Sequence, residues 1–256
     1  MKPVPTQFLL SVYVYLQKNS YICKKKFVMK VGVITFPGSN CDRDVVYVLE
    51  TLLSQRVIPL WHQDTNLQKC NIIVLPGGFT YGDYLRSGAI ANLSPIMKQV
   101  VAFANKGGLV VGICNGFQIL CESGLLPGAL LRNTNQLFTC TNQHIRVETT
   151  DSAWTAKCKK HQILSIPIAH AEGRYYADEK TLKELQNKDQ IVFRYCDAEG
   201  HFTPESNPNG SIYDIAGICN KTRNVFGMMP HPERCADDEL RNIDGRLLFE
   251  SILQHK

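Results

Sequence analysis

The sequence lacks several patterns that would assign it to a class at once. It has no Cys-x-x-Cys pair, and none of its ten cysteines forms a Cys/His cluster at zinc-ligand spacing, so we expect no metal site. It has no Gly-x-x-x-x-Gly-Lys-Ser/Thr loop, so we expect no P-loop nucleotide site. A chain of 256 residues can bury a sizeable core without disulfides. We therefore expect reduced thiols and a cytoplasmic protein.

Acidic residues are missing from the first 28 positions, which contain five lysines. These lysines account for the whole formal net charge of +5, so residues 29–256 are neutral and we expect no nucleic acid partner. The apolar run Phe8–Leu16 has nine residues, too few for a membrane helix of about 20. A signal peptide is an alternative, but no small-x-small cleavage site follows. We predict that residues 1–28 are an extension outside the fold, and that 29–256 form one domain beginning at Met29.

Short buried strands alternate with helical patterns, which predicts an α/β fold with a mostly parallel, doubly wound sheet and flanking helices. In the first half the pattern predicts strands at 30–36, 57–60, 72–75 and 109–113, with helices after 40, over about 89–105 and from about 115. In the second half it predicts a strand-like stretch over 130–147, strands at 163–169, 191–195, 212–218 and 224–228, and helices at about 179–187 and 237–254.

The stretch from Leu109 to Cys121 carries the strongest chemical signal. Its buried strand runs directly into a helix through Gly112-Ile-Cys114-Asn-Gly116, the nucleophile-elbow arrangement with cysteine in place of serine. The nucleophile of such an elbow sits on strained backbone, and small neighbours let the helix fold back on the strand. A thiol at a helix N-terminus is favoured as thiolate, which attacks carbonyl carbon. We predict that Cys114 is a nucleophile.

A general base is predicted where the last strand ends, in Pro230-His231-Pro232-Glu233. Side chains two apart on an extended segment leave on the same side, so Glu233 can hold one imidazole nitrogen and leave the other to take the thiol proton. His170 also follows a strand and has Glu172 two positions later, so chemistry alone leaves it open as the base. Gly77 and Gly78 end the neighbouring strand and are a candidate oxyanion hole.

These motifs resemble the class I (triad) glutamine amidotransferases, which have a flavodoxin-like fold. The stretches F-P-G-S-N-C-D-R-D (36–44), P-G-G-F-T-Y-G-D-Y-L-R (76–86), G-I-C-N-G-F-Q-I-L (112–120), H-A-E-G-R-Y (170–175) and G-M-M-P-H-P-E-R (227–234) resemble more narrowly the glutaminase subunits of phosphoribosylformylglycinamidine synthase. The resemblance covers essentially 29–256.

The resemblance implies a glutaminase that supplies ammonia to purine biosynthesis. Cys114, His231 and Glu233 would hydrolyse L-glutamine through a thioester, with the backbone N–H groups of Gly78 and Asn115 holding the oxyanion. It also implies that glutamine is contacted by three further side chains, those of Gln118, Phe79 and Tyr84.

The same resemblance implies two partners: a synthetase subunit, which would hold ATP and Mg²⁺, and a small accessory subunit. This chain itself would hold no cofactor. Three alternatives remain at this point: the glutaminase domain of a different triad amidotransferase, a cysteine peptidase or hydratase of the same superfamily, and an interaction subunit without activity.

Overall fold

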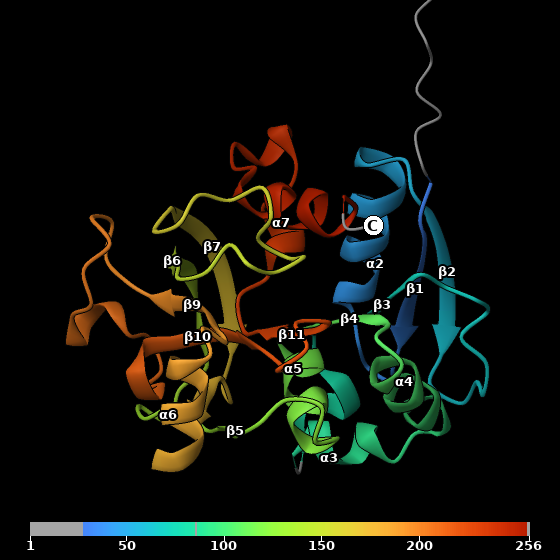
Figure 1. Ribbon diagram of the computed structural model, residues 1–256, viewed down its shortest axis with the longest axis horizontal. Helices are drawn as coiled ribbons and strands as arrows, with labels where there is room; N and C mark the ends of the chain where they lie inside the picture. Colours follow the sequence, from blue (N-terminus) through green and yellow to red (C-terminus); the bar gives the residue numbers. More distant parts are fainter. Residues whose placement is uncertain (1–27, 85, 255–256) are drawn as a thin grey trace, which may run out of the picture.

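The computed structural model describes residues 28–84 and 86–254 (Figure 1). Its main sheet has the strand order β2-β1-β3-β4-β11-β10-β9-β6-β7. These strands are β1 (Lys30–Thr35), β2 (Arg56–Trp61), β3 (Ile72–Leu75), β4 (Leu109–Ile113), β6 (Thr139–Val147), β7 (Ile163–His170), β9 (Ile191–Tyr195), β10 (Ile215–Cys219) and β11 (Val225–Met228). A second, two-stranded sheet pairs β5 (Ala129–Leu131) with β8 (Arg174–Tyr176).

Helices lie on both faces of the main sheet (Figure 1), with α2 and α7 on one face and α3, α4 and α5 on the other. The α-helices are α2 (Cys41–Tyr47), α3 (Ser87–Asn92), α4 (Pro95–Asn105), α5 (Asn115–Glu122), α6 (Glu179–Asn187) and α7 (Asp244–Ile252). A π-helical turn, η1 (Val48–Leu52), extends α2, and the 3₁₀ turns are η2 (Thr80–Asp83), η3 (Pro204–Ser206), η4 (Ile212–Asp214), η5 (Pro232–Arg234) and η6 (Asp238–Leu240). None of the described helices is long and apolar enough to cross a membrane.

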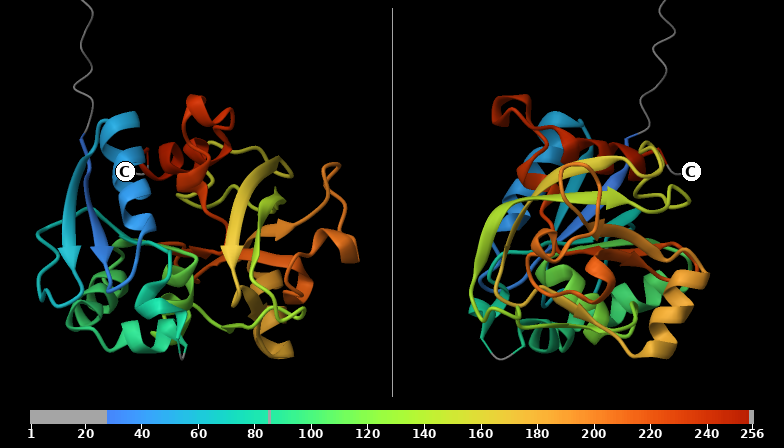
Figure 2. Two further views of the ribbon diagram at one scale, coloured as in Figure 1. Left: turned by 180° about the vertical axis from the view of Figure 1, so that it is seen from behind. Right: turned by 90° about the vertical axis from the view of Figure 1, so that its left-hand side faces the viewer.

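The main sheet is parallel in one half and antiparallel in the other, and Figure 2 shows the two halves from behind and from the side. The strands β2, β1, β3, β4 and β11 pair in parallel, whereas β10, β9, β6 and β7 continue the sheet with antiparallel pairs. Every residue of β3 and β4 except Leu109 is buried, as expected for parallel strands covered on both faces. The predicted α/β fold is confirmed, and the sequence pattern did not reveal the antiparallel half.

Two predicted helices are interrupted in the structure. The helix expected over 89–105 is divided into α3 and α4 because Pro95 holds Ser94 in an extended conformation with a ψ of 139°. The helix expected over 237–254 begins only at Asp244, because Arg241 adopts left-handed backbone with a φ of 56°. Apolar periodicity spans both interruptions, so it could not reveal either break.

Two predicted strand segments also differ from the structure. The strand expected over 212–218 begins at Ile215, since Tyr213 and Asp214 have positive φ in η4. The stretch over 130–147 forms β5 and β6, which belong to different sheets. The prediction that residues 1–28 lie outside the fold concerns residues that, apart from Val28, are outside the described part of the chain, so it stays a prediction.

Candidate active site

Cys114 sits at the sharp turn between β4 and α5. Its backbone has a φ of 52° and a ψ of −106°, a combination that non-glycine residues rarely adopt. The N–H of Cys114 donates to the carbonyl of Met228 at 2.8 Å, and its carbonyl accepts from the N–H of Gln118 at 3.2 Å. The predicted strained elbow is therefore confirmed, and neighbouring backbone holds it on both sides.

The glycines on either side of Cys114 allow α5 to fold back against the sheet. A Cβ added to Gly112 would lie 2.6 Å from the carbonyl carbon of Gly116, and one added to Gly116 would lie 1.9 Å from the carbonyl oxygen of Leu75. Such separations are well below van der Waals contact. The requirement for small residues that the sequence pattern predicted is thus a packing requirement between β3, β4 and α5.

His231 and Glu233 form a buried pair just after β11. His231 Nδ1 lies 2.7 Å from Glu233 Oε1, and both side chains are almost completely buried. The backbone N–H of His231 donates to the carbonyl of Pro167 at 2.8 Å. When Nδ1–H donates to Glu233 Oε1, Nε2 is the nitrogen available to accept a proton.

The imidazole of His231 lies beside the Cys114 thiol. A Cβ added to Gly77 would lie 2.7 Å from Cys114 Cβ and 3.0 Å from His231 Cε1, so the two side chains meet at the same glycine. Burial alone would lower the pKa of His231, but the negative charge of Glu233 and the adjacent Cys114 raise it well above its usual value. The site therefore favours a protonated imidazole next to the cysteine.

The oxyanion-hole candidates lie at the carboxyl ends of β3 and β4. Gly78 follows β3 with a φ of +91°, and a Cβ there would lie 2.0 Å from Asn40 Oδ1, so only glycine fits. The peptide plane that carries the Gly78 N–H is fixed by the carbonyl of Gly77, which accepts from the N–H of Cys41 at 3.3 Å. Asn115 is the first residue of α5, next to Cys114. The structure brings both residues to the nucleophile, and their role in binding an oxyanion stays a prediction.

The predicted glutamine contacts differ in their surroundings. Gln118 is buried, and its Nε2 donates to the carbonyl of Glu172 at 2.7 Å, so it joins α5 to the 170–175 loop. Phe79 is 47% exposed and stacks on Phe138 with ring centroids 6.0 Å apart. Tyr84 is 75% exposed, and its ring lies against Gly82 of its own loop. Contact of these three residues with substrate stays a prediction.

The competing histidine, His170, is buried at the end of β7 without a carboxylate partner in the described part of the chain. Neither of its ring nitrogens has a hydrogen-bond partner among residues 28–84 and 86–254. Burial, and secondarily the charge of His231, lowers the pKa of His170 to about 4. Of the two histidines, only His231 is paired with a carboxylate, so the geometry favours His231 as the base.

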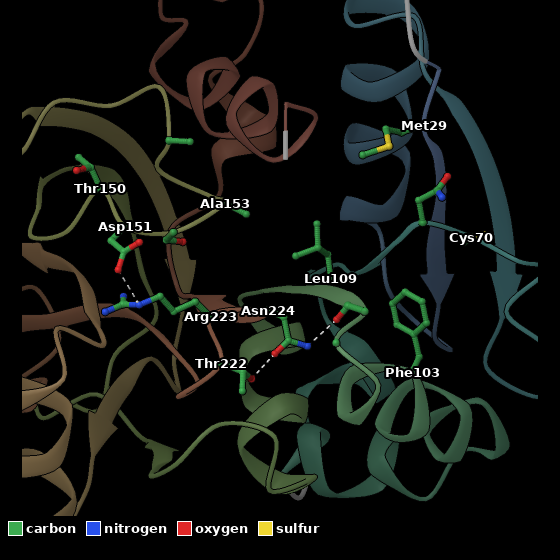
Figure 3. Close-up of a pocket in the computed structure, with 15 residues that line it drawn as sticks. Met29, Cys70, Phe103, Leu109, Thr150, Asp151, Ala153, Thr222, Arg223 and Asn224 are labelled. Atoms are coloured by element: carbon green, nitrogen blue, oxygen red, sulfur yellow. Dashed lines mark hydrogen bonds and ion pairs between the residues drawn. The ribbon is translucent and has the colours of Figure 1, made fainter. Parts of the chain in front are cut away.

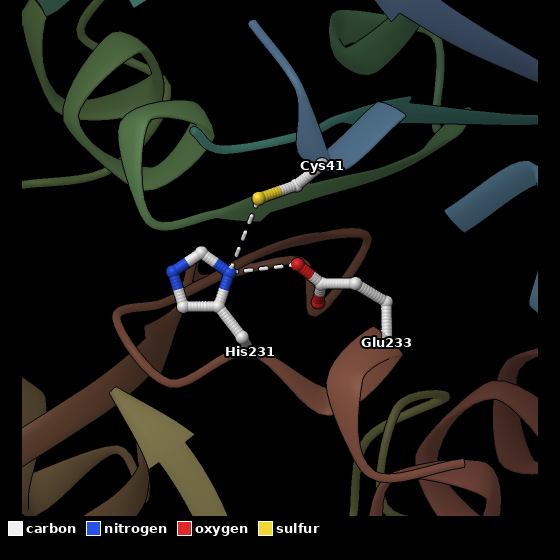
Figure 4. A group of neighbouring side chains, drawn as sticks. All are labelled: Cys41, His231 and Glu233. Carbon is white, nitrogen blue, oxygen red and sulfur yellow. Dashed lines mark hydrogen bonds and ion pairs between the residues drawn. The ribbon is translucent and has the colours of Figure 1, made fainter. Parts of the chain in front are cut away.

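A second cysteine, to which the sequence analysis gave no role, lies against the same imidazole (Figure 4). Cys41 Sγ is 3.7 Å from His231 Nδ1, and Arg234 Nη2 donates to this sulfur at 3.0 Å. Cys41, His231 and Glu233 place their ligand atoms within 4.8 Å of one another, a set that could hold a soft metal ion. The guanidinium of Arg234 already places a positive charge beside the Cys41 sulfur, and His231 Nδ1 is already hydrogen-bonded to Glu233. These three side chains therefore have partners without a metal ion. The signal for Cys41 in the sequence was its place in the stretch 36–44, which carries part of the family resemblance.

A cavity lies where the parallel strands of the sheet begin (Figure 3). Its volume is about 840 Å³, and it is lined at the amino ends of the parallel strands by residues such as Met29, Leu109 and Asn224. Arg223 and Asp151 form an ion pair of 3.1 Å in its wall. It contains none of the predicted site residues, so it is separate from the candidate active site.

Comparison with known families agrees with this geometry. The CobB/CobQ-like glutamine amidotransferase domain matches residues 28–246, a span that includes the cysteine, the histidine and the glutamate. The chain belongs to the CobB/CobQ-like glutamine amidotransferase family.

The individual relatives narrow the likeness to one kind of subunit within that family. The chain is 58% identical over 225 residues to the phosphoribosylformylglycinamidine synthase subunit PurQ of Koribacter versatilis, covering 88% of this chain and 97% of the relative. It is 56% identical to the same subunit of Acaryochloris marina, covering 88% and 96% of the two chains.

Among solved structures, it matches a chain of PurLQS from Thermotoga maritima with a TM-score of 0.78 and 39% identity, covering 89% of this chain and 98% of that one. Another glutamine amidotransferase from Thermotoga maritima shares 16% identity, with a TM-score of 0.54 and coverage of 88% and 90%, and this likeness shows the fold alone. The specific likeness is to PurQ, so a different triad amidotransferase is not favoured.

Proposed function

We propose that this chain is the glutaminase subunit of phosphoribosylformylglycinamidine synthase, which hydrolyses L-glutamine to glutamate and ammonia. The observation that carries the proposal is the buried pair of His231 and Glu233, 2.7 Å apart, beside Cys114 on its strained elbow. The relatives named PurQ specify the reaction that the ammonia serves.

The reaction begins when Cys114 Sγ attacks the side-chain amide carbon of glutamine. The thiol proton resides on His231 Nε2, and Glu233 stabilises the imidazolium through Nδ1. The tetrahedral oxyanion accepts hydrogen bonds from the N–H groups of Gly78 and Asn115, each worth about 3–4 kcal/mol in comparable sites. When the intermediate collapses, the proton moves to the amide nitrogen, which leaves as ammonia.

The product of this first half is a γ-glutamyl thioester on Cys114. A water molecule then gives a proton to His231 and attacks the thioester carbonyl. Collapse of the second tetrahedral intermediate releases glutamate, and the proton returns to the cysteine sulfur. No oxidant, reductant or metal ion takes part in this sequence, which needs the cysteine to stay reduced. A cytoplasmic location keeps thiols in that state.

The ammonia is passed to a synthetase subunit, which converts formylglycinamide ribonucleotide to formylglycinamidine ribonucleotide. The relatives are named as subunits, and the Thermotoga maritima structure is titled PurLQS, which supports an assembly with the synthetase and a small accessory subunit. ATP and Mg²⁺ are bound by the synthetase, and this chain holds no cofactor of its own.

The test is glutamate formation by the full chain, alone and mixed with a synthetase subunit, its accessory subunit, ATP and formylglycinamide ribonucleotide. Cys114→Ala should abolish glutamate formation, with a loss of at least about 10⁴-fold, because no other group can form the thioester. Cys121→Ala, on the same helix α5, is the matched control and should keep full activity. Glutamine-dependent product formation by Cys114→Ala would refute the proposal.

A further inference from the structure

Cys41 lies where His231, the proposed base, meets Gly77 and Gly78, which follow β3. It is the first residue of α2 and is fully buried. Its N–H donates to the carbonyl of Gly77 at 3.3 Å, and its sulfur lies 2.8 Å from where a Cβ of Gly78 would be. The same sulfur is 3.7 Å from His231 Nδ1 (Figure 4). The thiol therefore touches the histidine on the side of the ring that bonds Glu233.

Arg234 donates a hydrogen bond to the same sulfur. Its Nη2 donates to Cys41 Sγ at 3.0 Å, and its Nε lies 3.5 Å from Asp44 Oδ2. Arg234 directly follows Glu233 in the chain, so its guanidinium is a close positive charge for that carboxylate as well as for Asp44. The sulfur thus lies between two cationic groups, the guanidinium and the imidazole.

Glu233 has an oxygen to which the guanidinium could bind. Oε1 is bonded to His231, while Oε2 is buried with no hydrogen-bond partner within the described part of the chain. A guanidinium and a carboxylate form strong two-point hydrogen bonds. If Arg234 paired with Glu233, its positive charge would oppose the proton on His231 and weaken the base.

We propose that Cys41 is a positioning residue whose thiol holds the Arg234 guanidinium away from Glu233, so that the carboxylate stays paired with His231. The proposal rests on the proposed glutaminase function, in which His231 is the base. A sulfur suits this position because it is a weak, polarisable acceptor: it accepts the Arg234 N–H without drawing the imidazole away from Glu233.

The experiment compares Cys41→Ala with Cys41→Ser in the full chain assembled with its synthetase, using glutamate formation as readout. Cys41→Ala should lower kcat about 10-fold with an unchanged KM for glutamine, since Cys41 acts on the base and not on the substrate. Cys41→Ser keeps an acceptor for Arg234 and should recover most of the loss. Cys219→Ala is the matched control, because Cys219 is also buried and also contacts an arginine, Arg223, at 3.9 Å; it should leave kcat unchanged.

A double-mutant cycle shows whether the effect passes through Arg234. In the Arg234→Gln background there is no guanidinium to release, so adding Cys41→Ala should cost less than about 3-fold in kcat. A full 10-fold loss in that background, or a Cys41→Ala variant as active as the wild type, would overturn the proposal.

The protonation of His231 gives a readout that does not depend on activity. The groups that face this imidazole are Glu233, Cys114 and Cys41, with His170 acting through its charge. An NMR titration should place the pKa of His231 about 1 pH unit lower in Cys41→Ala than in the wild type, and near the wild-type value in Cys41→Ser. A wild type that forms no glutamate would refute the proposed function, whereas equal titration curves in all three proteins would refute the role of Cys41.

Discussion

The parallel and antiparallel halves of the sheet contribute to the active site in different ways. The parallel half carries the side chains that we propose to react, because Cys114 and His231 follow the adjacent strands β4 and β11. Gly77 and Gly78 follow β3 on the other side of β4. Parallel strands end at one edge of a sheet, so residues far apart in sequence converge there.

The antiparallel half supplies backbone to the same site. The carbonyl of Pro167 accepts from the N–H of His231, and the carbonyl of Ala169 lies 3.9 Å from Cys114 Sγ. The carbonyl of Glu172 accepts from the Gln118 side chain. Substitutions at the carboxyl ends of the parallel strands should therefore change catalysis, whereas those in the antiparallel half should change mainly stability.

Among substitutions that leave Cys114 in place, the largest effect is expected for Glu233→Gln, in the turn η5 after β11. The amide keeps the size of the side chain but can no longer stabilise the imidazolium or fix its tautomer, so kcat should fall about 10³-fold or more. Single-turnover glutamate formation measures this. His170→Gln is the comparison in the antiparallel half, and a loss of proton transfer as large as that of Glu233→Gln would assign the base to His170 instead.

The second prediction compares a glycine at the carboxyl end of a parallel strand with a glycine at the amino end of another. Gly78→Ala should lower kcat by about 10²-fold or more, because the added Cβ would lie 2.0 Å from Asn40 Oδ1 and must displace the oxyanion N–H. Gly107 precedes β4, also has a positive φ, and has open space around its Cβ position. Gly107→Ala should therefore cost only about 1 kcal/mol of stability and leave kcat unchanged. Equal kcat losses in the two variants would show that backbone strain, and not the place of Gly78, is responsible.

The third effect concerns the pH dependence of stability. The pKa of His231 is raised in the folded protein, so its contribution is fully present below the unfolded value of about 6.5 and is lost as the pH rises through the folded pKa. Glu233→Gln removes the main charge that raises this pKa. The difference in unfolding free energy between wild type and Glu233→Gln should shrink as the pH rises above about 6.5. Urea unfolding at several pH values measures it, and a difference that grows with pH would contradict the assigned charge state.

The smallest effect is expected for Ile168→Val in β7 of the antiparallel half. Ile168 is fully buried, so the lost methylene should cost about 1 kcal/mol of unfolding free energy. The kcat should not change, because Ile168 contributes no group to the reaction. Ile113→Val removes the same atoms next to Cys114 in β4 and should lower kcat as well. If Ile168→Val reduced kcat as much, the proposed division between the two halves would be wrong.

Several elements in both halves could be predicted from the sequence. The bounds of β3, β4, α6 and β9 agree with the predicted segments, because their apolar runs or helical spacing end at clear breaks. The breaks at Pro95 and Arg241 were missed, since apolar residues continue with helical spacing on both sides. The antiparallel pairing of β6 with β7 and β9 was also missed, because local periodicity gives a strand but not the direction of its neighbours.

The sequence by itself determined the elbow, since an elbow is a local structure in which Gly112, Cys114 and Gly116 are nearly adjacent. It also limited the candidates for the base to two histidines, His231 and His170, each with a glutamate two residues later. Only the tertiary structure decided between His231 and His170, because the choice depends on which imidazole is paired with a carboxylate. It alone brought Cys41 to His231, 190 positions away, since the ends of parallel strands converge in space whatever their separation along the chain.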